Sequence, residues 1–168
     1  SGSTFAIGMT TVTATATDDN GNTSTCTFDV TVADTTSPAI TCAAAPATAE
    51  ATSSSGAAVS WTDSTQATAT DDGDDSVAIT YSAASGSTFA IGTTTVTATA
   101  TDDSSNTSTC TFTVTVVDTT SPAITCADAP ATAEATSSAG AAVSWTDSTQ
   151  ATATDDGDDS VAITYSAA

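Results

Sequence analysis

The residues of this chain that could do chemistry are cysteines and carboxylates. Histidine is absent and no cysteine pair has CxxC spacing, so the pattern disfavours zinc and favours disulfides. Disulfides persist in oxidising surroundings, which predicts an extracellular protein, secreted or displayed on a cell surface. The four cysteines are Cys26, Cys42, Cys110 and Cys126.

Aspartates gather in two loops around Gly73 and Gly157. Calcium requires six to eight oxygen ligands, and clustered aspartates on a loop can supply several of them. The spacing does not match an EF-hand, and aspartates around a glycine also form ordinary solvated turns, so both interpretations stay open. A second candidate calcium set joins Asp118 with Asp102 and Asp103. The loop aspartates are Asp71, Asp72, Asp74, Asp75, Asp155, Asp156, Asp158 and Asp159.

Charge is strongly one-sided. The chain has 20 acidic residues and no lysine, arginine or histidine, for a net charge of −20. This excludes nucleic acid and anionic membrane surfaces as partners, because both need basic side chains. No long apolar run predicts membrane insertion. Without histidine or lysine, the usual catalytic bases and nucleophile activators are missing, so we expect no enzyme, no catalytic residue and no cofactor other than calcium.

Two sequons could carry N-linked glycans. Asn22-Thr23-Ser24 and Asn106-Thr107-Ser108 both fall in predicted turns, although chance matches are frequent in so threonine-rich a chain. Regular threonines such as Thr97 and Thr99 could carry O-linked sugars or form an ice-binding face. The β propensity of threonine explains them more simply.

The elements that position these residues repeat with a period of 84 residues, and the two copies differ at seven positions. This period is too long for a solenoid turn and fits a small independent domain. Asp34 to Pro38 and Asp118 to Pro122 are predicted joints, extended and stiff because proline fixes φ. We expect one complete domain at 35–118, the C-terminal part of another at 1–34, and the N-terminal part of a third at 119–168. The chain then reads as a segment of a longer array.

Each domain is predicted to be all-β. Hydroxyl and apolar residues alternate over 94–101 and 109–116, which indicates a half-buried antiparallel hairpin around a turn at 102–106. Residues 57–61 and 77–81 alternate in the same way. Short strands at this spacing predict an antiparallel sandwich. The expected core is Trp61, Tyr81, Phe89, Ile91 and Phe112, with Trp145 and Tyr165 repeating it in the next domain.

These stretches resemble the hyalin repeat (HYR) family across the whole period. The matching segments lie at 34–42, 58–62, 69–72, 81–89, 92–97, 106–114 and 118–126. The resemblance implies tandem immunoglobulin-like sandwiches, arranged as beads on a string, in extracellular proteins associated with adhesion and without known catalysis. The chain departs from the family in having Ala43, Ala90 and Ala127 where proline is frequent, and in lacking a cysteine in the loop at 71–76.

The cysteines can pair in two ways. Cys42 lies two residues from Ile40, and Cys110 two from Phe112, so each shares a strand face with an apolar residue. Pairing Cys42 with Cys110 would clip one sandwich internally and leave Cys26 and Cys126 to pair with neighbouring copies. The alternative pairs Cys26 with Cys42 and Cys110 with Cys126 across the joints.

The function predicted from these features is mechanical. Clipped sandwiches on stiff joints suit a structural segment of an extracellular filament, matrix fibre or adhesin stalk, with further copies of the chain joined head to tail as partners. The alternative is an adhesion or recognition module that binds a protein or glycan through its loops, with tandem display raising avidity.

Overall fold

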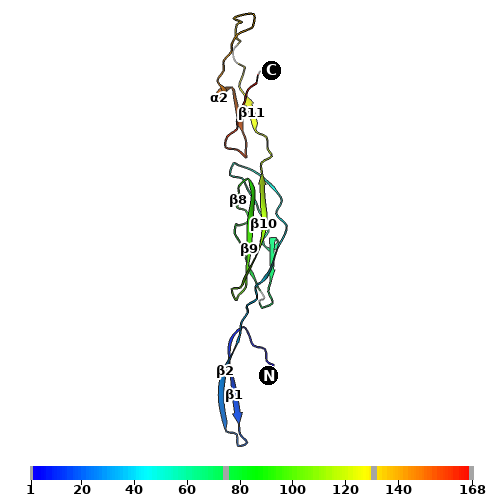
Figure 1. Ribbon diagram of the computed structural model, residues 1–168, viewed down its shortest axis with the longest axis vertical. Coiled ribbons are helices and arrows are strands. Elements are labelled where there is room, and N and C mark those ends of the chain that lie inside the picture. The colour runs from blue at the N-terminus through cyan, green and yellow to red at the C-terminus, as the bar shows by residue number, and fades with distance from the viewer. Residues whose placement is uncertain (1, 74–75, 130–131, 167–168) are drawn as a thin grey trace. The chain divides into compact units, whose positions relative to one another are not determined.

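The computed structural model describes residues 2–73, 76–129 and 132–166. The chain is nearly all β, with 44% of its residues in strands and 5% in helices, which confirms the predicted class. Figure 1 draws the strands as arrows and colours the chain from blue at the N-terminus to red at the C-terminus. Within the described residues, no helix is long and apolar enough to cross a membrane.

Two long hairpins dominate the fold. Strand β1 (Gly8–Thr17) pairs with β2 (Thr23–Val32), and one period later come β9 (Gly92–Thr101) and β10 (Thr107–Val117). The alternating sequence puts every second residue on one face, and along β9 these residues are buried while their neighbours are more exposed. The predicted hairpin is therefore confirmed.

Short strands complete the central repeat, defined here as residues 35–118. A four-stranded sheet has the order β4-β10-β9-β7, and two further pairs are β3-β6 and β5-β8. Strand β4 runs parallel to β10, with Ala49 opposite Val116. The architecture is the predicted all-β sandwich. The short strands are β3 (Ala39–Cys42), β4 (Ala49–Glu50), β5 (Ala57–Ala58), β6 (Ala67–Thr70), β7 (Ala78–Tyr81) and β8 (Thr88–Phe89).

The strand predicted at 57–61 is shorter than expected. β5 ends at Ala58, backbone hydrogen bonds continue at Val59 with Ser87 and Gly86, and at Trp61 a side chain takes the place of a backbone partner. Ser85 Oγ accepts a hydrogen bond from Trp61 N (2.8 Å) and donates one to Trp61 O (2.6 Å). A serine hydroxyl can do both because it carries a donor and acceptor sites, so the Trp61 backbone is satisfied without a neighbouring strand.

Two single-turn helices were not predicted. They are α1 (Asp63–Gln66) and α2 (Asp147–Gln150). Each is followed by a short strand, β6 or β12 (Ala151–Thr154), and β12 pairs with β11 (Ala123–Cys126). Buried Gln66 donates from Nε2 to the Ala44 carbonyl at 3.2 Å, so one polar side chain ties the turn to the preceding loop.

An aromatic cluster forms the core of the central repeat. Trp61 lies at its centre, 5.2 Å from Phe112 in an edge-on arrangement, 5.9 Å from Tyr81 and 6.1 Å from Phe89, measured between ring centroids. Such tilted pairs add to the energy of apolar burial. The buried members around it are Ala51, Ala57, Val59, Phe89, Val96, Phe112, Val114 and Val116.

Three residues predicted for the core are exposed. Ile91 is 43% exposed because it lies at a bend before Gly92, whose φ of 115° starts β9, and therefore outside the alternating strand. Trp145 and Tyr165 repeat the Trp61–Tyr81 contact at 6.1 Å but are 47% and 39% exposed. Among the described residues, nothing covers them as Phe112 covers Trp61.

The described chain divides into two compact units. The first comprises the chain through Thr41 together with Ala67–Thr80 and Ala98–Cys110, and holds the β1-β2 hairpin. The second comprises Cys42–Gln66, Tyr81–Thr97 and everything from Thr111 onward, and holds the aromatic core.

Candidate functional site

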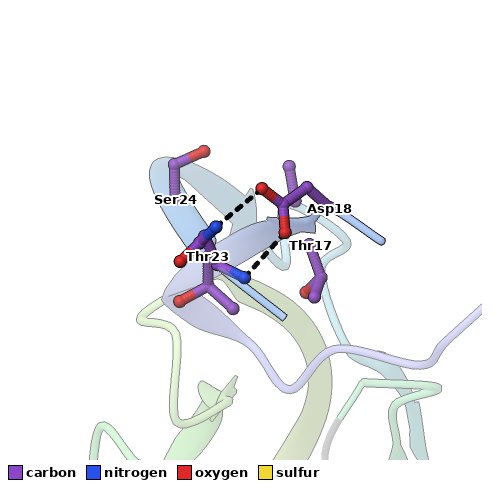
Figure 2. A pocket seen from close by; sticks show the side chains of 6 residues that line it. Thr17, Asp18, Thr23 and Ser24 are labelled. Carbon is purple, nitrogen blue, oxygen red and sulfur yellow. Dashed lines mark hydrogen bonds between the residues drawn. The ribbon is translucent and has the colours of Figure 1, made fainter. Parts of the chain in front are cut away.

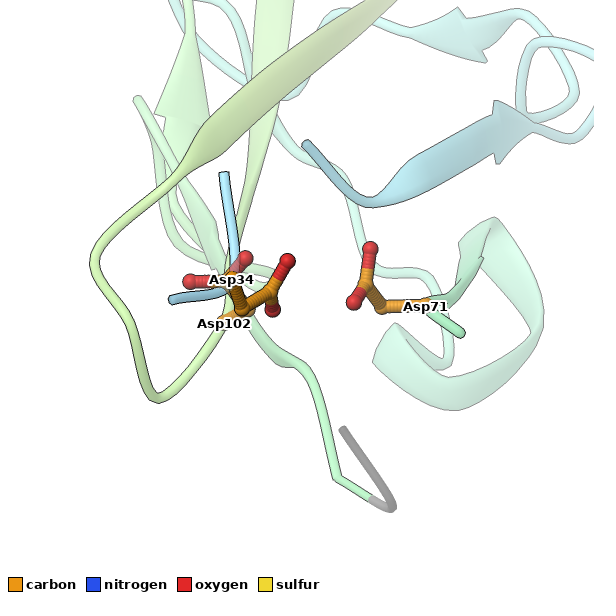
Figure 3. Close-up of side chains that lie close together, drawn as sticks. All are labelled: Asp34, Asp71 and Asp102. Carbon is orange, nitrogen blue, oxygen red and sulfur yellow. The ribbon is translucent and has the colours of Figure 1, made fainter. Parts of the chain in front are cut away.

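Three carboxylates from distant parts of the chain meet in the first unit. Asp34 comes from a joint, Asp71 from the acidic loop and Asp102 from the β9-β10 turn. One oxygen of each lies within 4.8 Å of the others. Figure 3 shows Asp71 facing the other two across a small gap. We call this set the first acidic cluster.

Local hydrogen bonds fix each of the three carboxylates. Asp34 Oδ1 accepts from the backbone N–H of Thr36 at 3.0 Å, and Asp71 Oδ2 from that of Gly73 at 2.9 Å. Asp102 is only 5% exposed and accepts from Asn106 twice, at 2.7 Å from N and 2.8 Å from Nδ2. These bonds engage one oxygen each of Asp34 and Asp71 and both oxygens of Asp102, and they hold the three carboxylates in place beside one another.

One oxygen of the first acidic cluster has no hydrogen-bond partner among the described residues. Asp34 Oδ2 is buried, and no described residue donates a hydrogen bond to it. Gly73 permits this approach, because a Cβ at that position would lie 2.5 Å from Asp34 Oδ2. A buried carboxylate oxygen is costly unless a donor or a cation satisfies it, and this chain has no cationic side chain to offer.

A second acidic cluster repeats the pattern in the second unit. Asp118, Asp155 and Asp158 also approach within 4.8 Å, and the period makes Asp118 and Asp155 equivalent to Asp34 and Asp71. Asp155 Oδ1 is buried without a partner among the described residues. Burial, and then the charge of Asp118, raise the pKa of Asp155. Three carboxylates that approach one another this closely, one of them with a raised pKa, are arranged as a cation site would be.

The predicted calcium residues divide between these clusters and the solvent. Asp71, Asp155 and Asp158 are cluster members, whereas Asp72 and Asp156 are exposed and belong to neither. Asp159 accepts a short hydrogen bond from Ser54, and Asp74 and Asp75 lie outside the described residues.

The second predicted set, Asp118 with Asp102 and Asp103, differs from what the structure brings together. Asp102 groups with Asp34, and Asp118 groups with Asp155 and Asp158. Sequence reasoning omitted Asp34 although the period already marked it as the equivalent of Asp118.

The cysteines fall into two states. Cys42 and Cys110 are disulfide-bonded, whereas Cys26 and Cys126 are exposed free thiols. The alternative in which Cys26 pairs with Cys42 across a joint is therefore not the arrangement in this structure. The two bonded cysteines lie near the two ends of the central repeat, and the two free ones occupy the equivalent positions at 26 and 126.

Hydrogen bonds fasten both joints to the central repeat. At the outgoing joint, the exposed carboxylate of Glu50 accepts from the backbone N–H groups of Thr119 (2.6 Å) and Thr120 (3.1 Å) and from both hydroxyls. These bonds, led by those from Thr119, lower the pKa of Glu50. At the incoming joint, Asn106 Nδ2 donates to the Asp34 carbonyl at 3.3 Å, and Ser108 Oγ donates to the Pro38 carbonyl.

The two sequons differ in accessibility. Asn106 is partly buried and its Nδ2 donates two hydrogen bonds, whereas Asn22 is exposed and its Nδ2 donates one, to Asp18 Oδ2 at 2.9 Å. Figure 2 shows Asp18 and its bonds in a shallow hollow at the β1-β2 turn. The lining residues are Ala16, Thr17, Asp18, Asn22, Thr23 and Ser24.

Comparison with known families matches the HYR domain model to residues 1–32 and 33–116. No curated protein matches the chain. The HYR domain is an extracellular, adhesion-type repeat module from a non-enzymatic family, and the disulfide agrees with that setting. Because the two matched segments make up more than half of its residues, this chain belongs to the HYR domain family.

Proposed function

We propose that the chain is a non-catalytic structural segment of an extracellular filament, matrix fibre or adhesin stalk. Near-identical copies in tandem suit a load-bearing shaft, since a shaft gains length from each copy whereas an enzyme gains little from repeating its whole scaffold. The disulfide and the aromatic core resist unfolding, and the net charge of −20 discourages aggregation between sheet edges.

The observation that carries this proposal is the fastening of the joints. A flexible string would leave its connectors free, but here Glu50 accepts from Thr119 and Thr120, while Asn106 and Ser108 hold the incoming joint. These hydrogen bonds thus restrict the backbone conformation of each joint, in addition to the φ restriction at its proline. Directed joints convert tandem domains into a stiff rod.

Electron microscopy of the native material tests the shaft function. We expect a regular fibre whose spacing corresponds to one domain, and a Glu50→Ala variant whose fibre bends more between domains. Asp72→Ala, which removes one exposed charge outside the joints, should leave the bending unchanged. Isolated flexible strings, or equal bending in both variants, would overturn the proposal.

We also propose that calcium binds the acidic clusters. Support comes from three converging carboxylates, from the unpartnered buried oxygens of Asp34 and Asp155, and from the absence of any cationic residue in the sequence. Hard oxygen ligands of this kind suit calcium. Because Asp34 belongs to a joint and Asp71 and Asp102 to the domain that follows, the ion would tie the two together.

Calcium titration of thermal unfolding tests this. We expect millimolar calcium to raise the melting temperature and EDTA to reverse the rise. Asp71→Asn should weaken the response at the first acidic cluster, while Asp72→Asn, with the same charge change on the same loop, should preserve it. An unchanged melting temperature, or an equal response in the two variants, would discard the site without touching the shaft function.

The second candidate function is recognition of a protein or glycan through loops. The hollow at the β1-β2 turn favours it, since hydroxyl, amide and carboxylate groups surround a space of about 380 Å³. Glycan-array binding by the whole chain, abolished by Asp18→Ala and not by Asp19→Ala, would support this function. No binding to arrays or to cell-surface proteins would leave the shaft as the function.

A further inference from the structure

We propose that the sequon at Asn106 is a modification site that controls the incoming joint, Asp34 to Pro38. The unmodified sequon fastens this joint beside the β9-β10 turn, and an N-linked glycan on Asn106 would release it. The inference deepens the shaft function proposed above and rests on it, because a released joint makes the shaft flexible at that point. The co-reactant is an oligosaccharide carried on a polyprenyl diphosphate.

The two side chains that define this sequon are also the two that hold the joint. A sequon consists of the amide of an asparagine and the hydroxyl of the second residue after it. Asn106 Nδ2 donates to the Asp34 carbonyl at 3.3 Å, and Ser108 Oγ donates to the Pro38 carbonyl. Thr107 between them is exposed. A glycosylating enzyme must therefore reach the same groups that fasten the joint.

The amide nitrogen of Asn106 has no hydrogen to spare. It carries two, and the second is donated to Asp102 Oδ2 at 2.8 Å. Glycan transfer forms a bond from Nδ2 to the anomeric carbon of the sugar and breaks the bond from that carbon to the diphosphate. The diphosphate leaves with the bonding electron pair, and Nδ2 loses one proton to a base of the enzyme. One hydrogen then remains for two acceptors.

The bond to the joint is the one that modification removes. Asn106 has two other bonds to Asp102, since its backbone N–H donates to Oδ1 at 2.7 Å and its carbonyl accepts from Asp102 N at 3.2 Å. These local bonds keep the amide beside Asp102. The bond to Asp34 is the longest of the set and reaches a different segment. Because Asn106 is partly buried beside that segment, a sugar on Nδ2 has room only when the joint moves away.

Disulfide formation closes the site. Cys110 follows Ser108 by two residues, Cys42 follows Pro38 by four, and both cysteines are disulfide-bonded. The disulfide therefore holds the strand of the sequon near the strand that follows the joint. Glycan transfer competes with this step. A chain that is modified first keeps a loose joint, and a chain that is oxidised first keeps a fastened joint and an inaccessible amide.

Release of the joint would also open the first acidic cluster. Asp34 belongs to the joint, and its carboxylate meets those of Asp71 and Asp102. Without the bond from Asn106 to the Asp34 carbonyl, that carboxylate is free to move away from the other two. The glycosylated chain should therefore respond less to calcium than the unmodified chain does.

Translation of the whole 168-residue chain into microsomes tests the competition, because microsomes supply the enzyme and the lipid-linked oligosaccharide. The chain follows a cleavable secretion signal and carries Asn22→Gln, so that one sequon remains. With dithiothreitol, which keeps the disulfide open, we expect a glycan on Asn106 in most chains. With oxidised glutathione we expect it in a minority. Peptide mass spectrometry measures the occupancy.

The matched control moves the sequon by three residues. Asp103→Asn creates a sequon with Ser104 and Ser105 on the exposed tip of the same turn, and Asn106→Gln removes the original one. No bond to the joint involves this tip among the described residues. Its occupancy should therefore be the same with dithiothreitol and with oxidised glutathione.

A protease that cleaves before aspartate measures the state of the joint. After reoxidation, cleavage before Asp34 should be about two- to tenfold faster in the glycosylated chain than in the unmodified chain, the factor expected from losing one hydrogen bond. Asn106→Ala should accelerate this cleavage without any glycan. Thr107→Ala, which removes an exposed side chain of the same sequon, should leave it unchanged.

Three results would overturn the proposal. These are complete modification of Asn106 after the disulfide has formed, equal dependence on dithiothreitol for the original and the moved sequon, or equal cleavage before Asp34 in modified and unmodified chains. None of them touches the shaft function, which micrographs of unmodified fibres test. Flexible strings formed by the unmodified chain would instead sink the shaft function and leave the occupancy measurement intact.

Discussion

The hairpins β1-β2 and β9-β10 have almost the same sequence and very different surroundings. Phe112 is 5% exposed and its equivalent Phe28 is 54% exposed; Val96 is fully buried, whereas Val12 is half-buried. Both hairpins form with the same alternation. The backbone conformation is thus encoded locally, in hydroxyl and apolar alternation and in the turn, whereas burial depends on the strands that cover the hairpin.

The comparison also separates the stability of the hairpin itself from the stability that neighbouring strands, the aromatic cluster and the disulfide add to it. A lone two-stranded hairpin is marginal in water, because one face of it stays exposed. The β9-β10 hairpin adds strand partners on both sides, an aromatic cluster and a disulfide-bonded cysteine. We therefore expect equivalent substitutions in the two hairpins to have unequal effects on unfolding.

Removing the disulfide should have the largest effect. Cys42→Ala with Cys110→Ala should lower the free energy of unfolding of the central repeat by about 4 kcal/mol, because a bond between these residues closes a long loop in the unfolded chain. The measurement is denaturant unfolding in dilute solution, followed by Trp61 fluorescence in a Trp145→Phe background.

The matched control for the disulfide is Cys26→Ala with Cys126→Ala. These thiols are free, so their loss should leave the unfolding of the central repeat unchanged. Equal destabilisation by the two double variants would show that the bonded and free cysteines do not differ as the structure describes.

Truncating the equivalent residues Phe112 and Phe28 tests whether the difference in their burial produces a difference in unfolding free energy. Phe112→Ala should cost about 3 kcal/mol of unfolding free energy, since it removes the ring against Trp61 and leaves a cavity. Phe28→Ala should cost less than about 1 kcal/mol in the monomer, as expected for an exposed side chain. Denaturant midpoints of both variants at low protein concentration measure the difference, and similar costs would contradict it.

Sequence alone was sufficient for the hairpins, the sandwich class and the buried aromatics Phe89 and Phe112, because period-2 alternation and turn residues act over short distances. It was insufficient for Ile91, whose exposure depends on where β9 begins. It also failed to find the α1 and α2 turns, which are too short to show a helical period.

The acidic clusters show a different limit. The loop aspartate Asp71 was predicted, but its neighbours Asp34 and Asp102 lie far away in sequence and meet it only through the fold. Nothing in the spacing distinguishes Asp71 from the exposed Asp72 beside it. Likewise, the clamp of Glu50 on Thr119 depends on the parallel pairing of β4 with β10, for which two residues give no pattern.

Exchanging the turn residues sharpens the comparison at the hairpin tips. Gly21 has a φ of 87°, and its equivalent Ser105 has a φ of 71°, a conformation that costs an L-residue about 1 kcal/mol. Ser105→Gly should stabilise the central repeat by up to about 1 kcal/mol, and Gly21→Ser should loosen the β1-β2 turn. Hydrogen exchange of Asp102 and Asp18 amides, which bond across these turns, reports each effect separately. Slower exchange in Gly21→Ser would contradict the expectation.

The smallest effect concerns pH at the outgoing joint. Hydrogen bonds from Thr119 and Thr120 hold the pKa of Glu50 below its usual 4.5. A carboxyl with a lowered folded-state pKa contributes stability that is present above its unfolded-state value and is lost as the pH falls through its folded-state value. The joint should therefore loosen below about pH 4.5.

Since all carboxylates titrate in this range, the informative quantity is the difference in melting temperature between the unaltered chain and Glu50→Gln, which should shrink as the pH falls. Glu134→Gln is the matched control: among the described residues no hydrogen bond reaches its carboxylate, so its difference should stay flat in the monomer. A flat difference for Glu50→Gln as well would mean that this carboxylate does not hold the joint, and that the proline alone directs it.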